Sequence, residues 1–363
     1  MKKNQSQPQQ FKTGYIISES LVFWMCGGIS AIAMLTVLVY SSINQIAAQS
    51  TVGAISGMLI LQALINWPHF LGAYSLLYRS TEQITKYKNA TLIVPALLLI
   101  VLSLSIIFSD QEKSGVISIN QSIAYITWLI AAFYLAWHYT GQSWGLIASF
   151  SHLSNTNWSH QEKKIIYLSI KILIAWHVIW GAQDLPANWL MGLQHLLPIA
   201  QNIINTICII YFVIGLIVWL RVFIRQGRKL DKRIFIVWLS IYLWYLTLFY
   251  IPKAYPLVQL SHALQYLIFP FRVDINKKFR NPINVAPLKK IIWGIRYFLI
   301  LFGLGLFLFL SPNYISNKNE IYTFSVMIAS IIAIHHYFVD SCIWKISNPE
   351  VRKKLFMHLP TQK

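Results

Sequence analysis

The sequence predicts an all-α integral membrane protein with about ten transmembrane helices and both termini in the cytoplasm. Its composition is the first reason, because 56% of the 363 residues are hydrophobic and only 11% are charged, whereas a soluble domain carries roughly 25% charged residues. The second reason is that the apolar residues form continuous runs of about 20 residues, the length of a membrane-spanning helix. The third is the distribution of lysine and arginine, which alternates between successive connecting segments.

The apolar runs divide the chain into ten expected helices. In chain order, they are residues 18–40, 53–78, 91–109, 121–148, 165–181, 199–222, 233–251, 255–271, 289–310 and 321–345. The fifth and eighth are short, and the fourth is long enough to project from the bilayer. Together they form one polytopic domain over residues 18–345. We expect residues 1–17 to be a disordered cytoplasmic N-terminus and residues 346–363 to be a basic cytoplasmic tail.

The basic residues set the orientation of these helices. Of the 30 lysine and arginine residues, 25 lie in the N-terminus and in every second connecting segment, around 79–90, 151–164, 221–233, 272–290 and 345–363. The five intervening loops hold only 3. Cytoplasmic loops of membrane proteins are enriched in lysine and arginine, so the alternation places both termini in the cytoplasm.

The formal net charge of +19 would also suit a protein that binds nucleic acid. The basic residues lie in short loops between apolar runs, however, where they act as a topology signal and attract anionic lipid headgroups. We therefore expect the lipid bilayer as a partner and no nucleic acid. The three cysteines each lie alone in an apolar segment, so the sequence indicates neither a disulfide framework nor a zinc knuckle.

Histidines occur at one depth on four of the expected helices. His69, His262 and His335 lie ten residues before the basic ends of their helices, and His138 lies at a comparable depth on the fourth helix. Ten helical residues span about 15 Å, which reaches the middle of the bilayer. A single buried histidine is more often a hydrogen-bonded core residue. Agreement in depth across four helices instead predicts a shared metal site.

The last of these helices carries two adjacent histidines, His335 and His336, and both are candidate ligands beside the other three. Adjacent positions on a helix are about 100° apart, so only one of the two can face the bundle centre. We expect this to be His336, because it shares a helix face with Asp340 four residues later. Asp340 is a candidate ligand or catalytic base. An ion pair between Asp340 and Lys345 at the membrane interface is an equally good interpretation.

Four further polar residues accompany these histidines: Asn66, Gln142, Gln265 and Tyr266. Each lies three or four residues from a candidate ligand and therefore on the same face of its helix. We expect them to orient the imidazoles or to contact the cofactor. Alternatively, the two glutamines hydrogen-bond across helices without any role in a site.

A nitrogen-rich pocket of this kind suits iron, zinc or copper better than magnesium or calcium. In an apolar setting it favours a non-haem iron oxidoreductase that acts on a lipid or isoprenoid substrate, which can enter from the bilayer. Zinc, or haem b with two axial imidazoles, is an alternative cofactor. Two other functions fit the same residues: a transporter or proton-coupled permease with a histidine-lined path, and a non-catalytic membrane assembly subunit.

Four motifs carry a resemblance to known proteins: N-x-P-H-F at 66–70, W-H-Y-x-x-Q at 137–142, H-x-x-Q-Y at 262–266 and H-H-Y-x-x-D-x-x-I-W-K at 335–345. The chain resembles an uncharacterised group of bacterial polytopic membrane proteins. That resemblance implies a location in the bacterial inner membrane and no particular activity. More distantly, isolated histidines on several helices are similar to the Brp/Blh-type membrane carotenoid dioxygenases, which implies histidine-bound iron. The HxxxH pair expected in those enzymes is missing here.

Overall fold

The computed structural model of the chain describes residues 18–109, 116–186, 190, 192–227, 230–279 and 284–343. Every regular element within these ranges is a helix, and Ile117 and Ser316 form one isolated bridge. The all-α prediction is confirmed. The expected N-terminal segment 1–17 and tail 346–363 lie outside the described residues.

The first two expected helices differ in continuity. Three elements, α1 (Glu19–Phe23), η1 (Trp24–Gly28) and α2 (Ile29–Ile43), form one unbroken helix. The second expected helix is split instead, into α3 (Gln45–Ser56) and a helix that begins at α4 (Leu59–Leu61). The chain bends by 49° between the two parts, because Met58 leaves the helical region with a ψ of 129°.

A wide π-helical turn precedes each of two helices that begin with a proline in the first turn. The first, η2 (Gln62–Asn66), leads into α5 (Trp67–Leu77), which contains Pro68. The second, η3 (Asn89–Ile93), leads into α7 (Val94–Ile107), which contains Pro95. Proline has no backbone N–H, so the preceding turn loses a hydrogen bond and can widen. Such bulges are frequent at functional sites.

Side-chain N-caps begin four of the remaining helices. At the start of α9, for example, the Ser159 hydroxyl accepts a hydrogen bond from the Glu162 N–H, and the Glu162 carboxylate accepts one from the Ser159 N–H. The remaining helices are, in chain order, α6 (Thr81–Lys86), α8 (Gln121–Leu153), α9 (His160–Ala182), η5 (Leu193–Leu196), α10 (Leu197–Gln226), α11 (Lys232–Tyr250), η7 (Pro252–Ala254), α12 (Tyr255–Lys278), α13 (Pro287–Ile315) and α14 (Phe324–Ile343).

Among the described residues, seven helices are long and apolar enough to cross a membrane, and the bent segment 45–77 would be an eighth. This confirms a polytopic helical protein. Two of the ten expected spans, α8 and α12, are absent from that set. Both are long enough, but both carry many polar side chains on their buried faces, including His138 and Thr140 on α8 and His262 and Gln265 on α12.

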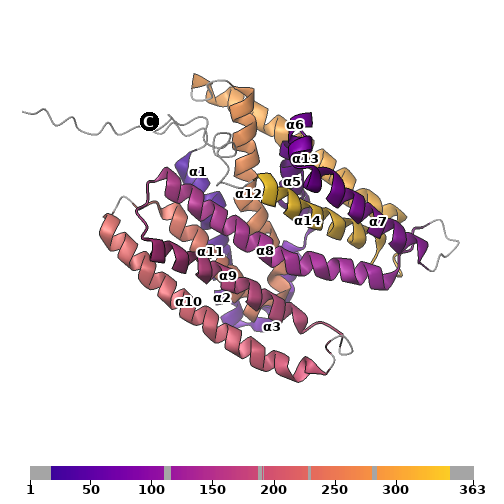
Figure 1. Cartoon of the computed structure of the whole chain (residues 1–363), viewed down its shortest axis with the longest axis horizontal. Helices are drawn as coiled ribbons and strands as arrows, with labels where there is room; N and C mark the ends of the chain where they lie inside the picture. The colour runs from indigo at the N-terminus through magenta and orange to yellow at the C-terminus, as the bar shows by residue number, and fades with distance from the viewer. Residues whose placement is uncertain are drawn as a thin grey trace, which may run out of the picture.

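The helices form two groups that α8 joins (Figure 1). On one side α8 packs against α9 and α11, and on the other against α14 and α7. In the second group α5 packs against α12, α13 and α14. Within its spanning window α11 is 67% buried, whereas α10 and α13 are 22% buried. We therefore place α11 in the core of the bundle, with α10 and α13 at its lipid-facing periphery.

Candidate metal centre

Four helices from distant parts of the chain each contribute one buried histidine to the centre of the bundle. His69 lies in the first turn of α5, directly after Pro68, and His138 lies in the middle of α8. His262 lies on α12 and His336 on α14. All four histidines are buried, and at most 6% of the surface of any of them is exposed. Buried polar groups need partners, so the neighbours of these rings determine what the cluster can do.

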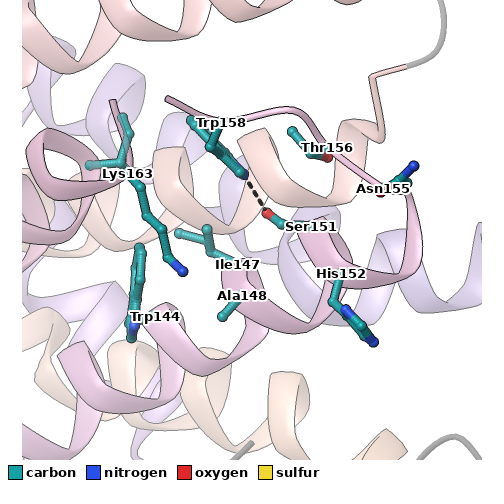
Figure 2. Close-up of a pocket in the computed structure, with 10 residues that line it drawn as sticks. Trp144, Ile147, Ala148, Ser151, His152, Asn155, Thr156, Trp158 and Lys163 are labelled. Atoms are coloured by element: carbon teal, nitrogen blue, oxygen red, sulfur yellow. Dashed lines mark hydrogen bonds between the residues drawn. The ribbon is translucent and has the colours of Figure 1, made fainter. Parts of the chain in front are cut away.

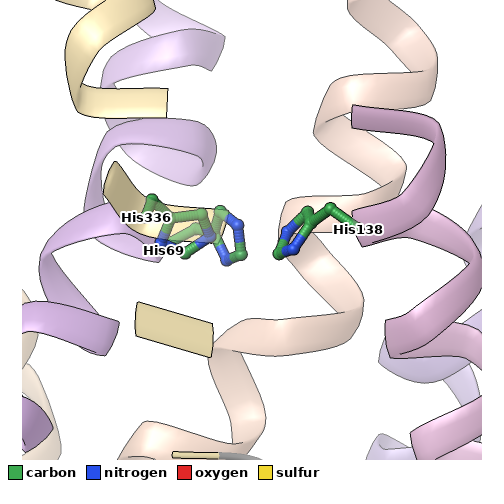
Figure 3. A group of neighbouring side chains, drawn as sticks. All are labelled: His69, His138 and His336. Atoms are coloured by element: carbon green, nitrogen blue, oxygen red, sulfur yellow. The ribbon is translucent and has the colours of Figure 1, made fainter. Parts of the chain in front are cut away.

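Three of the four histidines form a group that could hold a metal ion. One ring nitrogen from each of His69, His138 and His336 lies within 4.8 Å of the others. Figure 3 shows His69 and His336 side by side, with His138 facing them from the opposite side. The ring centroids are 4.4 Å apart for His69 and His336 and 5.0 Å apart for His138 and His336. Imidazole nitrogens converging in this way suit iron, zinc or copper.

His262 lies beside this triad. Its Nε2 atom is 2.9 Å from Nε2 of His138, and its ring centroid is 4.8 Å from that of His69. Two nitrogens at this distance share one proton in a hydrogen bond, or both can face a cation. His262 is therefore placed either to bind beside the triad or to orient His138.

Several ring nitrogens in the cluster have no hydrogen-bond partner among the described residues. They are Nδ1 of His69, Nδ1 of His262, and both Nδ1 and Nε2 of His336. The large majority of buried side-chain polar atoms in native proteins are paired, so four unpaired nitrogens in one cluster are unusual. The donor set therefore fits a metal ion, which would use lone pairs that the protein itself leaves unsatisfied.

A carboxylate and a phenol lie at the edge of the cluster. Oδ2 of Asp340 is 3.4 Å from Nε2 of His336 and 3.7 Å from Nε2 of His138. The Tyr266 hydroxyl donates a hydrogen bond of 3.0 Å to the other oxygen, Oδ1 of Asp340. The structure thus brings Asp340 and Tyr266 to the histidines. Lys345, the alternative partner of Asp340, lies outside the described residues.

The predicted amide side chains lie around the cluster and do not contact its ring nitrogens. The Gln142 amide donates to the backbone oxygen of His262 at 3.1 Å and reaches Oε1 of Gln265 at 3.5 Å. The Asn66 amide donates to Gln62 at 2.9 Å within η2. Gln142 therefore ties α8 to α12 beside the site, which is the bridging role that the sequence left open.

His335 is not brought to the cluster. Its Nε2 atom lies 2.8 Å from the backbone oxygen of Ala90 and 3.2 Å from the Tyr78 hydroxyl. Its ring stacks on Tyr74, with centroids 5.0 Å apart. Of the two adjacent histidines on α14, the structure therefore places His336 in the candidate site and His335 between α14, α5 and η3.

A cavity of about 280 Å³, here called the aromatic cavity, adjoins the histidines. His69 and His262 form part of its wall, and the rest is mainly aromatic and aliphatic. Trp67 and Phe309 stack there, with centroids 5.3 Å apart. Trp128 also lines the cavity and is 39% exposed. The aromatic cavity therefore reaches from the buried cluster to the outer surface of the bundle.

Two tyrosines near the histidines were not anticipated from the sequence. The Tyr139 ring centroid is 4.5 Å from that of His262, and the Tyr337 ring centroid is 4.6 Å from that of His138. Each follows a cluster histidine directly in the chain, so helical spacing alone assigns it to a different face. The sequence feature that could have identified both tyrosines is the repeated His-Tyr pair, in residues 138–139 and 336–337.

Comparisons of the chain with protein-family models, with curated proteins and with solved structures find no match. The site itself is therefore the basis for the proposed function.

Proposed function

We propose that the chain is a metalloenzyme of the bacterial inner membrane, an iron-dependent oxidoreductase that acts on a lipid or isoprenoid. The observation that carries this proposal is the convergence of His69, His138 and His336, with His262 beside them, in a fully buried cluster whose nitrogens are largely unpaired. A structural core could use one such histidine, but it gains little from bringing together four polar rings that must be desolvated.

The ring packing favours a single ion over haem. The imidazoles contact one another edge to face, with centroids 4.7 Å apart for His138 and His262 and 4.4 Å for His69 and His336. Axial ligation of haem would require a macrocycle between two of these rings. Within the nitrogen-binding metals, iron is proposed because an oxidoreductase needs a redox-active ion, and zinc is the alternative that elemental analysis distinguishes.

His69, His138 and His336 would hold the ion, with His262 as a fourth ligand or as the partner that orients His138. A bound iron would supply redox chemistry, with dioxygen as the proposed oxidant. Asp340 would accept and return a proton at Oδ2, and this role is supported by the distances of 3.4 and 3.7 Å from that oxygen to Nε2 of His336 and of His138. The Tyr266 hydroxyl fixes the other oxygen of the carboxylate. The Gln142 amide holds the α12 backbone at His262.

The aromatic cavity supports an apolar substrate. Its wall includes Trp67, Phe70 and Phe309 beside His69, and it reaches the exposed Trp128. Ligand sites with apolar walls and a few convergent polar groups are the usual form of small-molecule pockets. A hydrophobic chain dissolved in the bilayer could enter past Trp128 and place a carbon next to the histidines.

The same proposal includes a topology of ten spans with both termini in the cytoplasm. It requires α8 and α12 to cross the membrane together with the apolar helices. Their polar residues support this, because they face the protein interior and not the lipid.

Metal analysis of the purified protein tests the proposal. We expect about one iron per chain in the wild type and loss of the iron in His69→Ala, His138→Ala and His336→Ala. His335→Ala is the matched control, because this histidine lies on the same helix and bonds to Ala90 instead. Comparison of the membrane lipids of cells that express wild-type protein or His138→Ala then tests the substrate class. Equal and negligible metal in wild type and triad variants would refute the proposal.

Transport is the second candidate, and one observation favours it. The bend of 49° between α3 and α4 breaks the segment that carries His69, and broken helices are common in transporters. Solute flux into liposomes that contain metal-free protein, with a dependence on a proton gradient, would support transport over catalysis.

A further inference from the structure

A second cavity, of about 250 Å³, lies where α8 ends and α9 begins; we call it the α8–α9 cavity. It is separate from the histidine cluster, since its first residue on α8, Trp144, follows His138 by six residues, roughly 9 Å along the helix. The residues that line it come from α8, the connection and α9: Trp144, Ile147, Ala148, Ser151, His152, Asn155, Thr156, Trp158, Lys163 and Ile166 (Figure 2).

The charge of this cavity is positive. Lys163 lines the cavity, and no acidic residue does among those that the structure describes. In Figure 2 the Lys163 side chain extends along the cavity toward Trp144 and Ile147. The nearest acid in the chain, Glu162, faces another partner, because Arg225 binds it through two hydrogen bonds of 3.0 and 2.8 Å. The ammonium group of Lys163 is therefore available to an anion.

Neutral donors and an apolar floor complete the cavity. The Ser151 hydroxyl accepts a hydrogen bond of 3.0 Å from the Trp158 indole (Figure 2), which leaves its own hydrogen for another acceptor. Asn155 adds an amide at the rim. The Thr156 hydroxyl also lines the cavity, but it donates its hydrogen to Ser154, whose own hydrogen goes to the Phe150 oxygen. Ile147 and Ile166 form an apolar base. An occupant that matches this surface has an anionic, hydrogen-bond-accepting head next to a short apolar portion.

We propose that the α8–α9 cavity binds a phosphate group, as the headgroup of an anionic phospholipid or as a small soluble phosphate ester. Phosphate can accept hydrogen bonds from the Lys163 ammonium, the Ser151 hydroxyl and the Asn155 amide, and lysine is a common phosphate ligand. Basic pockets between membrane helices on the cytoplasmic side recognise anionic lipid heads, and the proposed topology places this end of α8 there. The assignment uses that topology but does not depend on the metal or on the oxidoreductase activity.

Native mass spectrometry of delipidated protein tests this site. The probes are dihexanoyl phosphatidylglycerol, which is anionic, and dihexanoyl phosphatidylcholine, which has no net charge. We expect one phosphatidylglycerol to bind in preference to phosphatidylcholine, and Lys163→Gln to weaken that binding about fivefold. Lys164→Gln is the matched control, because this lysine is adjacent, exposed and of equal charge but does not line the cavity. Ala148→Leu, which fills the cavity without a change of charge, should weaken the binding as well.

Competition with glycerol 3-phosphate distinguishes the two sources of phosphate. If millimolar glycerol 3-phosphate displaces phosphatidylglycerol from wild type but has no effect on Lys163→Gln, the site accepts soluble phosphate esters. If it does not compete, the site requires a lipid. Equal binding of the two lipids by wild type, or equal losses in Lys163→Gln and Lys164→Gln, would overturn the proposal.

Discussion

The two adjacent histidines of α14 have different surroundings and should therefore respond differently to substitution. His336 is fully buried in the cluster, and both of its ring nitrogens are unpaired among the described residues. His335 accepts or donates at Nε2 next to the Ala90 oxygen and the Tyr78 hydroxyl. One residue is thus placed for binding, and the other connects α14 to the neighbouring helices.

We predict that His336→Ala lowers metal affinity at least tenfold. His335→Ala should retain the metal and lose about 1 kcal/mol of stability, the usual net contribution of a hydrogen bond. In detergent this corresponds to a fall in Tm of about 2 °C. Elemental analysis and thermal unfolding of both variants measure the two effects. A loss of metal in His335→Ala and retention in His336→Ala would reverse the assignment.

Asp340 and Tyr266 form a second pair whose members should have unequal effects. Asp340 faces two of the triad histidines with Oδ2, whereas the Tyr266 hydroxyl donates to the other carboxylate oxygen, Oδ1. We predict that Asp340→Asn lowers metal affinity by about 10–100-fold, the range seen for groups that orient or complete a ligand set. Tyr266→Phe should have the smaller effect. Chelator competition, with the release of metal followed over time, separates the two; a larger loss in Tyr266→Phe would contradict the role given to Asp340.

At the scale of the elements, the site depends on the close approach of α5 and α12. Gly72 lies one turn after His69, and a Cβ atom at this position would lie 3.1 Å from Cγ of Pro270. That contact is tighter than nine in ten real Cβ contacts, so Pro270 must give way by a few tenths of an ångström. We expect a branched side chain at this position to push the two helices apart. Separation of α5 from α12 would move His69 away from His262.

We predict that Gly72→Val destabilises the protein by about 1–3 kcal/mol, the usual cost of overpacking, and lowers its metal content. Gly141→Val is the control on α8, because no atom lies within 4 Å of the added Cβ and the residue is exposed. Thermal unfolding and elemental analysis of both variants provide the measurements. If Gly72→Val kept wild-type stability and metal, the helix approach would not position the site.

The sequence predicted much of the site from one quantity, the depth of each histidine along its helix. Depth follows directly from residue spacing, and His69, His138 and His336 do converge. Rotation about the helix axis is harder to predict, because it depends on tertiary packing. For this reason Tyr139 and Tyr337, which follow cluster histidines, could not be placed beside the rings in advance.

The break at Gly57 and Met58 also had no clear sequence signal, since apolar residues continue on both sides.

At the scale of the whole molecule, the hydrophobic runs predicted the helical class and most of the spans. Hydropathy is a weaker guide for α8 and α12, because a helix surrounded by other helices can carry polar residues without exposing them to lipid. The two helices that fail the apolar test also carry His138 and His262. In this fold, low hydropathy of a long helix therefore coincides with a position next to the candidate site.

The proposed topology makes a specific prediction for α8, one of the two helices whose crossing hydropathy alone does not support. Its first residue adjoins the loop that holds Glu320, whose carboxylate accepts a hydrogen bond from Ile119 N–H at 3.1 Å. Asn319→Cys therefore reports the side on which α8 begins, and Asn157→Cys the side on which it ends; both residues are exposed. Because basic segments stay in the cytoplasm, a membrane-impermeant maleimide added to spheroplasts should label Asn319→Cys alone. Asn157→Cys should react only after lysis.

Lys253→Cys and Lys277→Cys apply the same test to α12, with Lys253 outside and Lys277 inside. The three native cysteines are buried or half-buried, so a background without them is the reference. Labelling of both members of a pair from the same side would show that the helix between them does not cross the bilayer. The histidine on that helix could then no longer lie at the depth of the others, and the cluster would require a different explanation.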